Sequence, residues 1–213
     1  MIKRLLPFNF DTRNGQKPLF IVIHCIGLPS PTAESAIQHF SNPPSEVSAH
    51  YIVKRNGEVI QLVEETNSAW ANGQIGKNLP TAEIARMYYN KGISLNSVSI
   101  SIEHEASEAE DLTPQGYKAS AQLIKEICSR WKIPIDALHI IPHRAIRDTK
   151  SCPGKIDVNY LITLALQPLT PVDKVNEQKL TILTQLVSLY QQLLALTIRN
   201  KTFGVVRSGS WPT

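Results

Sequence analysis

The sequence contains few cysteines and no long hydrophobic run. Its three cysteines, Cys25, Cys128 and Cys152, are odd in number and irregularly spaced, which argues against a framework of disulfides. No stretch of about 18 consecutive apolar residues occurs, so the sequence offers no membrane span. We therefore expect a protein with free thiols, built around an ordinary hydrophobic core.

The first ten residues do not resemble a secretion signal. Two basic residues, Lys3 and Arg4, stand near the start, but the apolar run around them is too short and too interrupted for the hydrophobic part of a signal peptide. We expect the protein either to be cytoplasmic or to act at the periplasm or cell wall after export by a route that this sequence does not reveal.

The sequence also has little excess charge of one sign. Its 22 basic and 18 acidic residues give a formal net charge of +4, and the basic residues are scattered. Nucleic-acid binding, which favours basic clusters, is therefore not expected. A polymeric anionic substrate such as a cell wall would still be attracted weakly.

The length and composition predict one domain with an extension. The chain has 213 residues, of which 42% are hydrophobic, and its composition changes after Pro168 and Pro171. We place the domain at residues 1–168 and a helical extension with a loose tail at 169–213. Residues 176–200 carry a wide apolar stripe, which could pack on the domain, mediate self-association or dock a partner protein.

Several segments have the patterns of strands. Residues 19–23 form a continuous apolar run, typical of a strand covered on both faces, and His24 follows it. Residues 47–63 predict a hairpin with a two-residue type I′ turn at Asn56-Gly57. Residues 97–103 alternate strictly, which predicts a polar face that ends in Glu103.

Helices are predicted to alternate with these strands. Ser30-Pro31 and Thr113-Pro114 have the pattern of helix starts. The predicted helices cover residues 31–40, 81–89, 113–132 and 158–166, and a short strand at 137–141 leads to His143. This order predicts an α/β fold with a central mixed sheet flanked by helices.

Three residues could hold a catalytic metal ion. His143 and Cys152 stand nine residues apart in a loop with Pro and Gly at its ends, and His24 ends an apolar strand. Two imidazoles, one thiolate and a water match a catalytic zinc site. Zinc lowers the pKa of a bound water to about 7, so hydrolysis of an amide or ester is expected. His24 as a core imidazole, Cys152 as a buried hydrophobe and His139 in place of His143 are the alternatives.

Five motifs occur in an order that resembles a known family. They are Ile-Val-Ile-His24, Val-Ser-Ala-His50-Tyr-Ile-Val-Lys-Arg-Asn-Gly, Ala-Trp70, Asn-Ser-Val-Ser-Ile-Ser-Ile-Glu103, and His143 with Lys150-Ser-Cys152-Pro-Gly. Over residues 19–166 the chain resembles the type 2 zinc N-acetylmuramoyl-L-alanine amidases, relatives of phage lysozyme-amidases and peptidoglycan recognition proteins. The resemblance implies an α/β fold with a zinc-bearing cleft. It also implies cleavage of the amide between N-acetylmuramic acid and the L-alanine of the stem peptide.

The resemblance also assigns roles to single residues. The family's zinc ligands fall on His24, His143 and Cys152, where many members have Asp at the last position. The catalytic glutamate falls on Glu103, and the lysine that stabilises the oxyanion falls on Lys150, which could otherwise be an ordinary surface lysine.

Two further residues are candidates for substrate binding. His50 would bind substrate or support the site, and Trp70 would stack on sugar or peptide; a structural role is the alternative for each. Two positions depart from the family, since Ala49 stands where some members have a catalytic Tyr and Ala71 where many have His.

The expected partner is peptidoglycan or a soluble muropeptide. A non-catalytic peptidoglycan-recognition module is the alternative function, but the presence of all three ligand candidates together with Glu103 disfavours it. A structural zinc fold with an unrelated partner is the remaining possibility.

Overall fold

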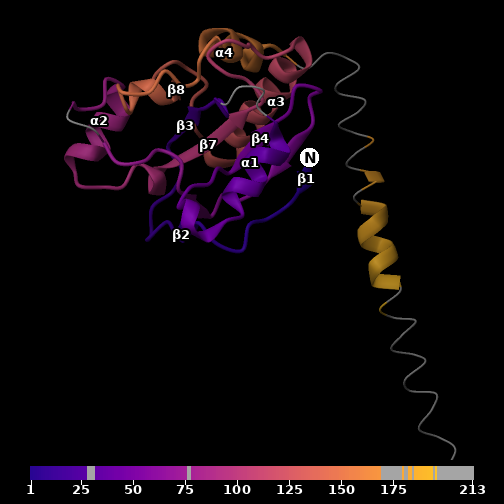
Figure 1. Cartoon of the computed structure of the whole chain (residues 1–213). Helices are drawn as coiled ribbons and strands as arrows, with labels where there is room; N and C mark the ends of the chain where they lie inside the picture. Colours follow the sequence, from indigo (N-terminus) through magenta and orange to yellow (C-terminus); the bar gives the residue numbers. More distant parts are fainter. Residues whose placement is uncertain are drawn as a thin grey trace, which may run out of the picture. The chain divides into compact units, whose positions relative to one another are not determined.

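The computed structural model describes residues 1–27, 32–75 and 78–168, together with residues 179, 182–183, 185–193 and 195 (Figure 1). The chain divides into two compact units, residues 1–167 and 168–213. In the second unit the described residues from 179 onward are helical, and apolar side chains such as Leu183, Leu186 and Tyr190 are exposed. The rest of the stripe predicted over 176–200, the tail and the Ser30-Pro31 helix start lie outside the described residues.

A six-stranded mixed sheet forms the centre of the first unit, as predicted, in the order β1-β5-β4-β7-β3-β8. The strands are β1 Ile2–Lys3, β3 Phe20–Ile23, β4 Tyr51–Val53, β5 Val59–Gln61, β7 Ser99–His104 and β8 Ile140–Pro142. Strand β3 runs parallel to β7 and to β8, and β4 runs parallel to β7 but antiparallel to β5. A separate antiparallel pair joins β2 Phe10–Thr12 to β6 Asn67–Ala69.

Helices cover both faces of this sheet. They are α1 Ala33–Phe40, α2 Glu83–Asn90, α3 Pro114–Trp131 and α4 Val158–Leu166. Because side chains alternate along a strand, Ile21 and Ile100 pack in the core formed with α3 and α4, while Phe20 and Ile52 pack in the cores formed with α2 and α1. The helix start at Thr113-Pro114 is confirmed, since Thr113 Oγ1 accepts a hydrogen bond from the Gly116 amide at 3.1 Å.

The hairpin of β4 and β5 is confirmed, but the predicted turn type is wrong. A type I′ turn needs positive φ at both central residues, whereas Gly57 has a φ of 86° and Asn56 is not among the residues with positive φ. The Asn56 side chain instead accepts from the Glu58 amide at 2.9 Å, and Gly57 N donates to Lys54 O at 3.0 Å. Asn56 therefore does not adopt the left-handed conformation expected there. Its side-chain hydrogen bond with the Glu58 amide holds the turn instead.

The polar face predicted for β7 has the right alternation but is not exposed to solvent. Ser99 and Ser101 are 0% and 1% exposed. The segment after β6 covers Ser99, since Asn72 Nδ2 donates to Ser99 Oγ at 3.0 Å. Alternation fixes which residues share a face, but the coverage of that face comes from segments far away in the sequence. Glu103 therefore ends a buried face.

The N-terminal segment carries β1, β2 and a buried arginine. Arg13 is 4% exposed and donates to the carbonyl oxygens of Glu65, Ser97 and Ser99 at 2.7, 2.7 and 2.9 Å. Burial lowers the pKa of Arg13 to about 10. A buried cation is stable only when it is well bonded, so these bonds fix the N-terminal segment to the start of β7.

His50 lies beside Arg13 and is fully buried. Its Nδ1 accepts a hydrogen bond from the Ser101 amide at 3.0 Å, so Nε2 carries the ring proton and donates to Asn67 O at 3.1 Å. Burial and the charge of Arg13 lower the pKa of His50 to about 3. The ring is therefore neutral in the folded protein, and its contacts are structural.

This network predicts a loss of stability in mild acid. Unfolded His50 gains a proton near pH 6.5 and folded His50 does not, so its contribution is complete above pH 6.5 and falls as the pH decreases toward the folded pKa of about 3. Between pH 7.5 and pH 5, His50 should account for about 2 kcal/mol of the decrease in the free energy of unfolding. Urea unfolding of wild type and His50→Asn measures it. His39→Asn, at an exposed position of α1, is the control; equal pH dependence in all three proteins would contradict the assignment.

Candidate functional site

The carboxyl ends of three neighbouring parallel strands bring polar residues together. Ile23 of β3 is in register with Ile102 of β7 and with Pro142 of β8. The next residues along these strands are His24, Glu103 and His143. They occupy one row across the sheet, and because alternation is shared within a row, the three side chains start from the same face.

His24, His143 and Cys152 form a group that could hold a metal ion. Their possible ligand atoms all lie within 4.8 Å of one another, and the two imidazole ring centroids are 4.3 Å apart. One zinc ion forms bonds of about 2.0–2.3 Å to nitrogen and sulfur, so two atoms bound to the same ion are separated by a distance of this scale. The structure therefore brings together the three ligand candidates that the sequence predicted.

The two imidazoles have the protonation state that a metal ligand needs. His143 Nε2 donates to Asn72 O at 3.2 Å, which leaves Nδ1 without a proton in the neutral ring. His24 Nε2 is buried and has no hydrogen-bond partner among the described residues. Burial lowers the pKa of both histidines, that of His24 well below 6.5. Neutral imidazoles with a free nitrogen fit a metal ion.

The loop that carries Cys152 is held closely against the site. Cys152 O accepts from the Arg144 amide at 2.8 Å, and Cys152 Sγ accepts from the Cys25 amide at 3.2 Å. Gly154 has a φ of 64°, and a Cβ there would lie 2.4 Å from Ser107 O, so the loop needs glycine at this close approach. A hydrogen bond with the Cys25 thiol, and next burial, raise the pKa of the Cys152 thiol. A cation must therefore displace the proton of this thiol when it binds.

Glu103 lies directly beside the ligand candidates. Its Oε1 is 3.9 Å from His24 Nδ1, and its Oε2 is buried without a hydrogen-bond partner among the described residues. Burial, and next the charge of Cys25, raise the pKa of Glu103 to about 8. A carboxyl group with a pKa near neutrality can both accept and donate a proton at physiological pH.

The other residues that the sequence predicted for this site differ in their exposure and in their contacts. Lys150 is exposed on the Cys152 loop, and its positive charge adds to the effect of burial in lowering the pKa of His143. Trp70 is partly exposed and donates from Nε1 to Asp11 at 2.8 Å. His50 makes the structural contacts described above, so both of its ring nitrogens are already used. His139, the alternative to His143, instead pairs with Asp136 at 2.7 Å.

Two supporting residues were not predicted from the sequence. Asn72 is 1% exposed and holds His143 through its carbonyl oxygen. His104 is fully buried; its Nδ1 donates to His24 O at 2.7 Å, and its Nε2 accepts from Ser120 Oγ at 2.8 Å. Groups that orient metal ligands are commonly of this type. The only signal in the sequence was the position of His104 next to Glu103, and Asn72 had none.

Unpaired buried polar atoms are concentrated around this site. In the described part of the chain such side-chain atoms occur in five residues, His24, Asn72, Ser101, Glu103 and Arg147. Asn72 and Arg147 both hydrogen-bond to His143, and Ser101 shares the strand face of Glu103. Since buried polar atoms are rarely left without a hydrogen bond, their concentration here indicates a ligand-binding site.

Comparison with known proteins gives one family. A family model described as N-acetylmuramoyl-L-alanine amidase matches residues 14–155. The curated N-acetylmuramoyl-L-alanine amidase A of Achromobacter lyticus is 30% identical over 146 residues, which are 63% of this chain and 69% of the relative.

Solved structures share the fold. The catalytic domain of XlyA is 21% identical with a TM-score of 0.55, and the match covers 77% of this chain and 97% of that one. A selenomethionine derivative of AmpD is 22% identical with a TM-score of 0.59, and the match covers 76% and 93% of the two chains.

The contact between His104 and His24 predicts an effect on metal affinity. Replacing His104 by Asn removes the ring that joins Ser120 to the backbone of His24, so the dissociation constant for zinc should rise about tenfold. Competition with a chromogenic chelator measures this constant, and urea unfolding of the metal-free protein measures the separate loss of stability. His139→Asn is the matched control and should bind zinc like the wild type. Equal affinity in the two variants would contradict a positioning role for His104.

Proposed function

Since the chain belongs to the N-acetylmuramoyl-L-alanine amidase family and is a peptidoglycan amidase, we propose that His24, His143 and Cys152 hold the zinc ion of its active site. One observation carries this proposal: the possible ligand atoms of all three lie within 4.8 Å of one another, next to an unpaired carboxylate oxygen. Two imidazoles and one thiolate form a donor set that suits zinc. When bound, zinc would act as a Lewis acid that polarises the amide carbonyl and favours ionisation of water.

Glu103 is the residue that moves the proton in this proposal. As a carboxylate it takes the proton from the attacking water while the oxygen of that water forms its bond to the amide carbon. It then gives this proton to the nitrogen of the L-alanine as the carbon–nitrogen bond breaks. A group whose pKa lies near the working pH suits both steps, and burial brings the pKa of Glu103 into that range.

Lys150 would compensate the negative charge that develops on the carbonyl oxygen. It is exposed on the loop that also carries Cys152, two residues before that proposed ligand. A fixed positive charge at the oxyanion stabilises the transition state more than the ground state. Lys150 therefore lowers the barrier without taking part in proton transfer.

The other supports of the site keep the proposed ligands in place. Asn72 O accepts a hydrogen bond from His143 Nε2, and His104 Nδ1 donates a hydrogen bond to His24 O. Both interactions are buried, so water does not compete with them. The ligands are thereby oriented before an ion arrives, which raises the affinity of the site for the metal.

The first test removes the thiol. Cys152→Ala leaves two imidazoles, so zinc content and turnover should be lost together. Zinc is measured by mass spectrometry of the dialysed protein, and turnover by release of free stem peptide from a muropeptide. Cys128→Ala removes a thiol of the α3 core and should retain both. Turnover by Cys152→Ala without bound zinc would disprove the proposed role of the metal.

The second test separates proton transfer from metal binding. Glu103→Gln keeps the size of the side chain but cannot accept a proton, so kcat should fall by about 10²–10⁴-fold. Zinc content should stay at the wild-type level, because Glu103 is not one of the proposed ligands. A variant with nearly full kcat would contradict the role of Glu103 as the base.

A further inference from the structure

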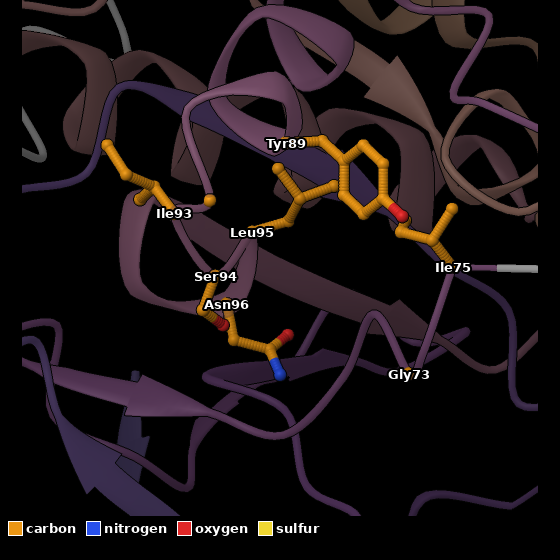
Figure 2. A pocket seen from close by; sticks show the side chains of 8 residues that line it. Gly73, Ile75, Tyr89, Ile93, Ser94, Leu95 and Asn96 are labelled. Atoms are coloured by element: carbon orange, nitrogen blue, oxygen red, sulfur yellow. The ribbon is translucent and has the colours of Figure 1, made fainter.

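Figure 2 shows a pocket of about 310 Å³ in the first unit. Its walls come from the segment after β6, the end of α2 and the turn before β7. The residues that line it are Gly73, Ile75, Tyr89, Gly92, Ile93, Ser94, Leu95 and Asn96. This volume is at the lower end of the range for ligand pockets and would fit a group about the size of one sugar ring.

The pocket adjoins the proposed metal ligands through Asn72. Asn96, a lining residue, accepts from the Asn72 amide through Oδ1 at 3.0 Å, and Asn72 O accepts from His143 Nε2 at 3.2 Å. One residue therefore separates the pocket from a proposed zinc ligand. A chain-like substrate cut at the zinc site could reach the pocket with a neighbouring unit.

The lining combines an apolar wall with unused polar groups. Figure 2 shows Tyr89, Leu95 and Ile75 on one side, and Ser94 and Asn96 on another. No hydrogen bond within the described residues engages Tyr89 Oη, Ser94 Oγ or Asn96 Nδ2. An exposed aromatic ring near free donors and acceptors suits a ligand with both apolar and hydroxyl or amide surfaces.

The lack of charge in the lining favours the glycan strand of peptidoglycan over its stem peptide. None of the eight lining residues is charged, although Arg147 packs against Gly73 from outside this set. The stem peptide carries carboxylates, which prefer cationic partners, whereas the acetamido sugars of the strand are neutral. Building on the proposed function, we propose that this pocket binds an N-acetylated sugar of the glycan strand, next to the sugar whose amide is cut.

The first experiment tests binding on the full chain. The probe is the tetrasaccharide of N-acetylglucosamine, which has no peptide, and calorimetry measures its affinity for wild type, Tyr89→Ala and Met87→Ala. Met87 is the matched control because it is exposed on the same helix (44%, against 40% for Tyr89) and does not line the pocket. Loss of the ring should weaken binding about fivefold to tenfold, and Met87→Ala should bind like the wild type. No saturable binding by the wild type, or equal affinity in all three proteins, would overturn the proposal.

The second experiment separates this pocket from the proposed function. Turnover is measured with a muramoyl peptide of one sugar and with soluble glycan strands that carry stem peptides. Tyr89→Ala should raise the ratio of the KM for strands to the KM for the muramoyl peptide, and Tyr89→Phe should restore it. An unchanged ratio in Tyr89→Ala would overturn the sugar pocket even if the enzyme is active. Absence of zinc-dependent hydrolysis of the muramoyl peptide by the wild type would instead contradict the proposed function.

Discussion

The register of three parallel strands is the constraint on which the rest of this structure depends. Ile23, Ile102 and Pro142 lie in one row, so the residues that follow them, His24, Glu103 and His143, leave the sheet together. A shift of one residue in either pairing would send a side chain to the opposite face, where α3 and α4 pack. The apolar residues of β3, β7 and β8 therefore set the geometry of the polar group at their ends.

Holding this group together is costly for the folded chain. Two buried imidazoles lie close to a half-buried thiol and a half-buried carboxyl group. Burial favours the neutral form of both histidines and of Glu103, and the hydrogen bond with Cys25, followed by burial, favours the neutral form of Cys152. Asn72 O accepts a hydrogen bond from His143, His104 Nδ1 donates to His24 O, and the Cys25 amide donates to Cys152 Sγ. These bonds offset part of the cost and orient the ligand candidates. A divalent cation would remove most of the remaining cost, because it pairs with the donor atoms that the fold leaves unsatisfied.

Much of this could be predicted from the sequence, for physical reasons. The continuous apolar run before His24 and the alternation before Glu103 predicted two strands and the face of the sheet on which their side chains lie. The α/β class followed from the order of the strands and helices. The pattern around His143 and Cys152 indicated two of the residues that we propose as metal ligands. In each case the information lies within a few neighbouring residues.

What the sequence could not provide depends on contacts between distant segments. The cover over Ser99 comes from the loop of Asn72, 27 residues away. The buried Arg13 bonds with carbonyl oxygens that lie 52 to 86 residues further on. The bond between His104 and Ser120 needs β7 and α3 to be packed already. Local periodicity contains none of these pairings, so β7 looked half exposed and His50 looked available to substrate.

Crystallography gives the most direct test of the proposed metal site. Crystals of the full chain grown with zinc, with anomalous differences recorded on both sides of the zinc absorption edge, would locate any bound ion. We expect one peak in the first unit, within bonding distance of His24, His143 and Cys152 and adjacent to Glu103. A peak bound elsewhere, with these three side chains left without an ion, would contradict this expectation.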